Sequence, residues 1–425
     1  WRPWFAKGIE DWNRAFEEAG FKNAIRAGRV PTPEEDPDFS MEDARYSFIR
    51  WVANETRNAV GPSVADPRSG EIIASQVLFY QNHMKSYRNL AIIETGAVDP
   101  RLQSLTIPDS LMGEALRVVA AHEVGHALGL PHNMGASYAY PVDSLRSADF
   151  TARMGISNSI MDYARMNYVA QPGDRDVKLM RMVGPYDLYS VNWGYRALPN
   201  APTAEDEQST LDRWIREKES DPLYRFGYQQ GFPPVDPRSQ TEDLGNDAIK
   251  ASSYGIANLK RVIPNLVDWT RQDHNDYDEI TEIYTESLFH WRELMLHVAT
   301  WVGGVYETPR RPNQPGPIYE PVDRAKQVAA LDFLEREALS TQRWLTPTII
   351  TEKIDESGSL DRLRRFQGGV LATLLNVDRM IRLVEAEERN PQNAFTLLDF
   401  LDRVRSIVWS ELSQGTAIDV YRRNL

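Results

Sequence analysis

The stretch His-Glu-Val-Gly-His-Ala-Leu-Gly-Leu-Pro-His, from His122 to His132, decides how this chain is interpreted. Residues four apart on a helix lie about 40° apart around the axis and about 6 Å along it. His122 and His126 can therefore both direct a ring nitrogen at one ion. Glu123, the next residue, stays beside the same ion, where it can contact a metal-bound water.

After His126 the sequence contains residues that end a helix and turn the chain back. Gly129 can adopt the left-handed conformation that ends a helix, and Pro131 cannot continue one. His132 can then return as a third ligand. Three neutral imidazoles leave one tetrahedral position for water, which is typical of a catalytic zinc site. The alternative, a buried helix with incidental histidines, is disfavoured because the chain has only 7 histidines among 425 residues.

The composition limits the classes of protein that need consideration. A chain of 425 residues is long enough for two domains, and its net charge of −13 argues against nucleic acid or an anionic membrane surface as the main partner. No apolar run is long enough to span a membrane, and no cysteine is available for a disulfide. Neither a signal peptide nor a lipidation motif opens the chain, and its start at Trp1 without Met is expected for a processed or excised segment.

The front of the chain alternates between helical and strand-like patterns. Apolar residues recur at the helical period over residues 4–19, and short runs rich in β-formers predict strands over 25–30, 46–52 and 71–80. The acidic, proline-bearing stretch 31–43 predicts a surface loop, and Leu111–Leu130 predicts the helix that carries the histidines. The following stretch, 133–195, is loop-like.

That loop-like stretch holds Ser159-Ile160-Met161-Asp162-Tyr163. A methionine in a turn usually only fills a gap in the core. Downstream of an elongated H-E-x-x-H motif, however, it resembles the Met-turn of the metzincin proteases, so the two motifs together resemble the metzincin clan. Other segments are similar to a large bacterial family of metzincin-like zinc proteases, namely Asp11-Trp12-Asn13, Asp66-Pro67-Arg68, Gly70-Glu71-Ile72, Gly184-Pro185-Tyr186-Asp187 and Trp193-Gly194-Tyr195.

The resemblance implies an α+β fold, with a metzincin-like catalytic domain over residues 1–200 and a mostly α-helical domain over 201–425. The catalytic domain is expected to combine a twisted mixed sheet with the active-site helix, above a Met-turn. The resemblance also implies a bacterial protein that is exported to the periplasm, the cell surface or the medium.

The same resemblance implies a role for each site residue. His122, His126 and His132 are expected to bind Zn²⁺, and Glu123 to act as the general base on the zinc-bound water. As in astacin-like and serralysin-like metzincins, Tyr163 is expected to ligate zinc or stabilise the oxyanion, whereas Met161 has a structural role without contact to the ion. A polypeptide substrate is expected to bind extended along the 71–80 strand, as the strand at the edge of the cleft.

Two features depart from the familiar metzincin pattern. Asn133, the residue after the third histidine, is none of the acidic, proline or Ser/Thr choices that distinguish metzincin families. The first strand of the metzincin sheet normally precedes the first helix, yet here the helix begins almost at Trp1. We therefore expect an exposed sheet edge or a missing partner there.

Beyond residue 200 the sequence becomes helical in character. A short polar linker at 201–206 and a helix at 210–218 are expected, then helices over 247–263, 276–303, 321–340, 346–355, 359–387 and 393–414. Two Glu/His pairs four residues apart miss the spacing of a di-iron bundle and are predicted to be solvated or interface residues: Glu286 with His290, and Glu293 with His297. The acidic residues Asp236, Glu242, Asp243 and Asp247 are predicted to form a solvated loop without a calcium motif.

The function expected from these observations is a zinc-dependent endopeptidase, with Zn²⁺ as cofactor. One alternative is a zinc hydrolase of a non-peptide amide or ester. The other is a catalytically idle binding or scaffold protein of the cell envelope, although the intact Glu123 and the complete histidine set count against it. The sequence does not indicate an oligomeric state.

Overall fold

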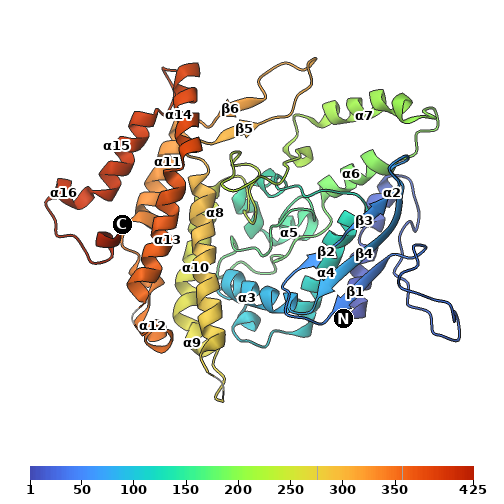
Figure 1. Cartoon of the computed structure of the whole chain (residues 1–425), viewed down its shortest axis with the longest axis horizontal. Coiled ribbons are helices and arrows are strands. Elements are labelled where there is room, and N and C mark those ends of the chain that lie inside the picture. Colours follow the sequence, from blue (N-terminus) through green and yellow to red (C-terminus); the bar gives the residue numbers. More distant parts are fainter. Residues whose placement is uncertain (275, 357) are drawn as a thin grey trace. The chain divides into compact units, whose positions relative to one another are not determined.

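The computed structural model describes residues 1–274, 276–356 and 358–425 and divides into two compact units (Figure 1). The first unit comprises Trp1–Ala91, Thr106–Tyr228 and Leu244–Asn246, and the second comprises Ile92–Leu105, Gln229–Asp243 and Asp247–Leu425. The first combines a sheet with helices and the second is mainly helical, which confirms the predicted α+β fold class with a helical C-terminal region. The domain boundary near residue 200 stays a prediction.

A four-stranded sheet organises the first unit. Its strands are β1 (Phe48–Val52), β2 (Ala59–Val60), β3 (Ser63–Ala65) and β4 (Ile72–Tyr80). β4 lies in the middle of the sheet, because β1 pairs with it in parallel while β2 and β3 pair with it antiparallel. Alternate residues of β4, including Ser75, Val77 and Phe79, are buried, as expected for a strand with one face on the core.

The strand order corrects two predictions. Residues 25–30 form no strand, because this short apolar run finds no partner in the sheet. The 71–80 strand is not at the edge of the sheet, since β4 has neighbours on both sides. β1 is the last strand in the order, and an exposed edge at the place of a first metzincin strand stays a prediction. A hollow of about 2180 Å³ is lined by all of β1, but the three site histidines do not line it.

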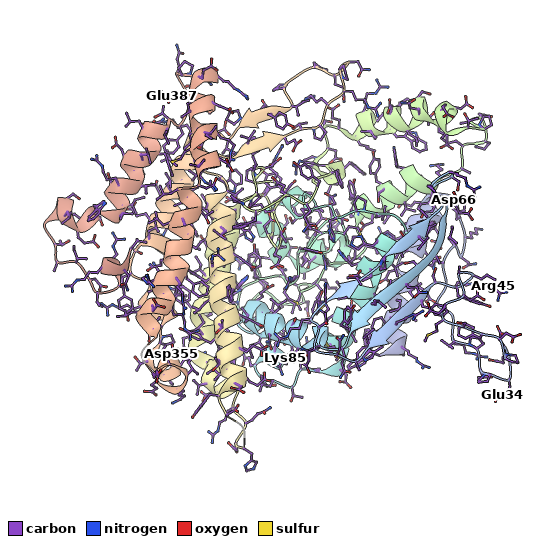
Figure 2. All side chains as sticks on the ribbon, in the orientation of Figure 1. Glu34, Arg45, Asp66, Lys85, Asp355 and Glu387 are labelled. Carbon is purple, nitrogen blue, oxygen red and sulfur yellow. The ribbon has the colours of Figure 1, made fainter. Side chains whose placement is uncertain are left out.

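Long surface loops connect the elements of this sheet. Glu34 and Arg45 lie on the loop that precedes β1, and Asp66 lies in the turn between β3 and β4 (Figure 2). Asp66 accepts hydrogen bonds from the backbone and side chain of Arg68, which closes that turn. The acidic stretch 31–43 therefore forms a surface loop, as its composition predicts.

The predicted N-terminal helix is two helices, α1 (Arg2–Glu10) and α2 (Asn13–Glu18), with a break at Asp11 and Trp12. Trp12 has no exposed surface, and its indole nitrogen donates a 2.9 Å hydrogen bond to the carbonyl of Ala121. The break between α1 and α2 thus places the Trp12 side chain against the helix that carries His122 and His126.

That helix, α4 (Asp109–Ala127), follows α3 (His83–Thr95) and packs against α1 and β4. It ends earlier than predicted, at Ala127. Gly129 has a φ of +85°, and the Leu130 amide donates back to the Gly125 carbonyl at 3.0 Å. This arrangement confirms the predicted left-handed glycine at the end of the helix.

The remaining helices of the first unit include α5 (Ala148–Met154), α6 (Pro185–Tyr195) and α7 (Ala204–Lys218). Thr203 caps α7 by accepting a hydrogen bond from the Asp206 amide. The linker predicted at 201–206 is accordingly shorter, because this capping box begins the helix at Ala204. None of the described helices is both long and apolar enough to cross a membrane.

The second unit is a helical bundle with one small hairpin. Its main elements are α8 (Ala248–Val262), α10 (Asp278–Ala299), α11 (Arg324–Leu334), α12 (Thr348–Ile354), α13 (Ser359–Leu374), α14 (Val377–Arg389), α15 (Leu397–Val408), α16 (Ser410–Gln414), β5 (Val305–Glu307) and β6 (Tyr319–Pro321). α10 contacts α8, α11 and α13, and its Tyr284 and Trp291 are fully buried. The helix predicted over 359–387 is two helices, because Asn376 caps α14 with its side chain.

Burial excludes the solvated alternative for His290 and His297 and leaves the interface alternative. It also corrects the solvated-loop prediction for Asp236 and Asp243, whereas Asp247 is exposed as predicted. His290 and His297 are 6% and 7% exposed, and the Nε2 of His297 lies 2.9 Å from the Thr241 carbonyl. Asp236 is 3% exposed and accepts hydrogen bonds from Arg238 and from the Glu307 amide. These groups are buried because the bundle supplies each with a polar partner, which spacing along the chain cannot reveal.

Candidate metal centre

The three predicted histidines converge on one point. His122 and His126 lie one turn apart on α4, and His132 returns after the glycine that ends the helix. The Nε2 of His132 is 3.3 Å from that of His122 and 3.0 Å from that of His126. The ligand atoms of the three histidines all lie within 4.8 Å of one another, which is close enough to hold one metal ion. Among the described residues, this is the group of His, Cys, Asp or Glu side chains that meets this condition.

The other ring nitrogens of the two helical histidines are held by backbone carbonyls. The Nδ1 of His122 lies 2.8 Å from the Ile160 carbonyl, and the Nδ1 of His126 lies 2.9 Å from the Leu130 carbonyl. A carbonyl only accepts, so each Nδ1 carries the proton and each Nε2 directs a lone pair at the common point.

Burial also favours the form of the histidines that can bind a metal. It lowers the pKa of His122 well below its ordinary value and lowers that of His126 as well, since a charged imidazole is poorly solvated there. Neutral His122 and His126, with the Nε2 of His132 at 3.3 and 3.0 Å from theirs, provide the donor set of an open zinc site. The residues present therefore fit Zn²⁺.

Glu123 lies directly beside this centre and is 6% exposed. Burial raises the pKa of its carboxyl to about 7, and the positive charge of Arg181 acts in the opposite direction. Gly61, between β2 and β3, lies against it. A Cβ added at Gly61 would be 2.5 Å from the backbone oxygen of Glu123 and 3.1 Å from its Oε2. The outer strand of the sheet thus passes next to Glu123.

The Met-turn residues lie at the same centre. Met161 is 2% exposed and packs under α4, where a Cβ at Gly125 would be 2.2 Å from its sulfur. The Tyr163 ring centroid is 4.4 Å from that of His132 and 5.5 Å from that of His122. The structure therefore brings together all six residues singled out from the sequence: His122, Glu123, His126, His132, Met161 and Tyr163.

Asp187 fixes the start of the Met-turn, a role that the sequence reasoning missed. Its carboxylate accepts hydrogen bonds from the Ser159 hydroxyl at 2.6 Å and from the amides of Ile160 and Gly184, both at 2.7 Å. Asp187 is fully buried, and burial raises the pKa of its carboxyl to about 7. The available signal was the acidic residue at the third position of α6, which follows Gly184 and Pro185.

A second buried carboxylate, Asp162, fixes the end of the turn. It accepts hydrogen bonds from the Ser137 amide at 2.6 Å, the Ser157 hydroxyl at 3.0 Å and the Tyr163 amide at 2.6 Å. Burial raises the pKa of this carboxyl as well. The turn that holds His122 through Ile160 is thus anchored at both ends.

Asn133 has a structural explanation here. Asn133 is fully buried, and its backbone N–H donates a 3.1 Å hydrogen bond to the Met161 carbonyl. Its side-chain oxygen accepts from the amides of Gly135 and Gly227, at 3.2 and 2.8 Å. The residue after the third histidine therefore ties that histidine to the Met-turn and to the 225–228 segment.

Arg181 is a further residue near the centre that the sequence reasoning missed. It is 5% exposed, and its Nε and Nη1 have no hydrogen-bond partner among the described residues. Val183, two residues further along the chain, packs in the same buried cluster as Met161 and Val124, and the charge of Arg181 acts on His122, Glu123, Asp162 and Asp187. No local sequence pattern marks this arginine.

Comparison with known proteins agrees with this geometry. A family model described as Met-zincin matches residues 104–416, which cover the histidines, the Met-turn and most of the helical region. No curated protein and no solved structure matches the chain. Because the family model covers well over half of the sequence, this chain belongs to the Met-zincin family.

Proposed function

We propose that the protein is a zinc-dependent endopeptidase. The observation that carries the proposal is the convergence of three imidazole Nε2 atoms with a buried carboxylate, Glu123, on the next helical position. Membership of the Met-zincin family supports a zinc metallopeptidase-like role in coarser terms. His122, His126 and His132 would hold the ion.

A zinc ion held there would supply a Lewis acid that activates water and polarises the scissile carbonyl. Glu123 takes a proton from the attacking water and later delivers it to the leaving amine. Its burial supports this cycle, because a carboxyl whose pKa lies near 7 can both accept and release a proton near neutral pH. Tyr163, whose ring lies against His132, stabilises negative charge on the carbonyl oxygen through its hydroxyl.

The substrate strand proposed here is the outer one, residues 59–65, instead of the predicted 71–80. The Tyr80 amide bonds to the Asn58 carbonyl and the Gln76 amide to the Pro62 carbonyl, both at 3.3 Å. In an antiparallel ladder, groups directed inward and outward alternate, so the main-chain groups of Ala59 and Gly61 face outward. No strand of the described residues pairs with that outer side.

An extended peptide that pairs with Ala59 and Gly61 would pass over Glu123, because Gly61 is in contact with that residue. This geometry favours cleavage within flexible or unfolded segments over removal of terminal residues. It also favours a peptide substrate over a small ester, which offers no main chain to pair.

The decisive experiment compares wild type with Glu123→Gln on a denatured protein such as casein, with and without a chelator. We expect the variant to bind one zinc but to lose at least about 100-fold in rate, as for removal of a general base. Glu114→Gln is the matched control, because Glu114 lies on the same helix with a 40% exposed side chain.

Cleavage by Glu123→Gln at a rate comparable to wild type, or cleavage that is insensitive to chelation, would contradict the proposed mechanism. Small ester and amide substrates are included in the same assay. Turnover of these without any cleavage of casein would favour the alternative of a non-peptide hydrolase.

A further inference from the structure

Arg181 is a buried cation without a direct counter-charge. It is 5% exposed, its Nε and Nη1 have no hydrogen-bond acceptor, and no ion pair of its guanidinium is found among the described residues. Charged side chains are rarely buried without a partner, because removal of the charge from water is costly unless it is paired. An anion that is not part of the chain would satisfy this arginine.

The neighbouring carboxylates do not take that place. Asp162 and Asp187 each accept three hydrogen bonds from the backbone and hydroxyl groups of the Met-turn region. These bonds hold both carboxylates in the turn. Arg181 acts on them only through its charge.

Arg181 lies two residues before Val183, which belongs to the same buried cluster as Met161 of the Met-turn and Val124 of α4. His122 and Glu123, which must meet the substrate under the proposed function, are 4% and 6% exposed, so the 5% exposure of Arg181 is equally compatible with contact. Its charge acts on both of them and also on His83, at the start of α3.

A second arginine adds positive charge at the same place. Arg165, two residues beyond Tyr163, also acts electrostatically on His83. The Nδ1 of His83 is itself buried without a partner.

We propose that Arg181 is the anchor of an anion-binding subsite beside the catalytic centre, and that it receives a carboxylate of the substrate. The inference rests on the proposed peptidase function and specifies its substrate class as peptides with an acidic group near the scissile bond. That carboxylate is either an Asp or Glu side chain or a free C-terminus, and guanidinium recognises both by the same charge-assisted hydrogen bonds.

The test uses pairs of fluorogenic peptides that differ only in the acidic group. One arm compares Glu with Gln on either side of the scissile bond, and the other compares a free with an amidated C-terminus. For wild type we expect kcat/KM to be at least about tenfold higher for the acidic member of one arm, within the range for interactions with charged groups. A ratio near one in both arms overturns the proposal without any variant.

Arg181→Gln then distinguishes recognition from a structural role. We expect the acidic peptide to lose its advantage while the amide peptide is cleaved within about threefold of the wild-type rate and zinc content is unchanged. A purely structural role would slow both peptides equally and leave their ratio intact, which overturns the proposal. Arg153→Gln is the matched control, since Arg153 is 67% exposed on α5. If Arg181→Gln does not fold, Arg181→Lys must lower the ratio at least threefold.

Binding separates failure of the subsite from failure of the proposed function. Zinc-loaded Glu123→Gln is titrated with the same peptide pairs, and no turnover is needed. Preferential binding of the acidic peptide by this protein, together with no cleavage by wild type, would refute peptidase activity and support the subsite. Equal binding of both members in both arms refutes the subsite.

Discussion

Gly125→Ala tests how closely the Met-turn is fitted to the histidine helix. Gly125 lies on α4 between Glu123 and His126, and a Cβ there would be 2.2 Å from the sulfur of Met161 and 2.8 Å from Cζ2 of Trp12. Ordinary contacts between such atoms are about 3.5–4.0 Å, so the sulfur would have to retreat by roughly 1.5 Å.

Both neighbours are buried side chains. Met161 is 2% exposed and Trp12 has no exposed surface. Overpacking of this kind costs about 1–3 kcal/mol. Replacement of a helical glycine by alanine returns about 0.5–1 kcal/mol. We therefore expect a net loss of about 1–2 kcal/mol in the free energy of unfolding.

A displaced Met161 would also disturb metal binding. The preceding residue, Ile160, holds the Nδ1 of His122 through its carbonyl. Loss of such an orienting contact typically costs about 10- to 100-fold in metal affinity, and we expect a decrease of about tenfold for zinc.

The assay combines denaturant unfolding of the apo-protein with a competitive zinc titration. Gly194→Ala is the matched control, because Gly194 lies in α6 and a Cβ there meets no atom within 4 Å. The control should be as stable as wild type or slightly more so. A Gly125→Ala protein that matches the control in both stability and zinc affinity would refute the close fit described here.

Three further predictions concern separate features. Gly61→Ala should lower kcat/KM about 100-fold with zinc affinity unchanged, because the new Cβ displaces the outer strand from the Glu123 backbone; unaltered kinetics would exclude this strand from substrate binding. Asp187→Asn should lower the free energy of unfolding by about 2–4 kcal/mol, since an amide cannot accept all three hydrogen bonds; a loss below 0.5 kcal/mol (about the level of a surface change) would contradict that role. Arg422 lowers the pKa of the Glu411 carboxyl to about 2, so the stability that this ion pair contributes is present above pH 4.5 and is lost as the pH falls toward 2. The free energy of unfolding of Glu411→Gln should therefore decrease less than that of wild type between pH 6 and pH 3. Equal decreases would contradict the assignment.

Much of the candidate site was predictable because its determinants are local. The spacing of His122, Glu123 and His126 on one helix and the helix-ending Gly129 depend only on backbone geometry over a few residues. The helical character beyond residue 200 was predictable for the same reason. Its exact breaks were not, because caps such as the Asn376 side chain compete with an otherwise continuous helical pattern.

The order of strands was not predictable from periodicity. The 71–80 run was correctly assigned as a strand, yet its position in the middle of the sheet depends on β1, β2 and β3 pairing along its two sides. Alternation of apolar residues reports that a strand has a buried face, but it does not report which strands are its neighbours. The strands on the outer side of β4 are instead β2 and β3, within residues 59–65. Both are too short for their sequence to show a clear alternation of apolar residues.

The sequence by itself determined the candidate metal ligands, since His122 and His126 lie one helical turn apart and the helix-ending Gly129 allows His132 to return beside them. Only the tertiary structure decided what surrounds them: Asp187 and Asp162 at the two ends of the Met-turn, Asn133 between the third histidine and that turn, Gly61 against Glu123, and the unpartnered Arg181. These residues come from segments as far apart along the chain as Gly61 and Asp187. Contacts of that range follow from packing and the pairing of buried polar groups, which no local pattern encodes.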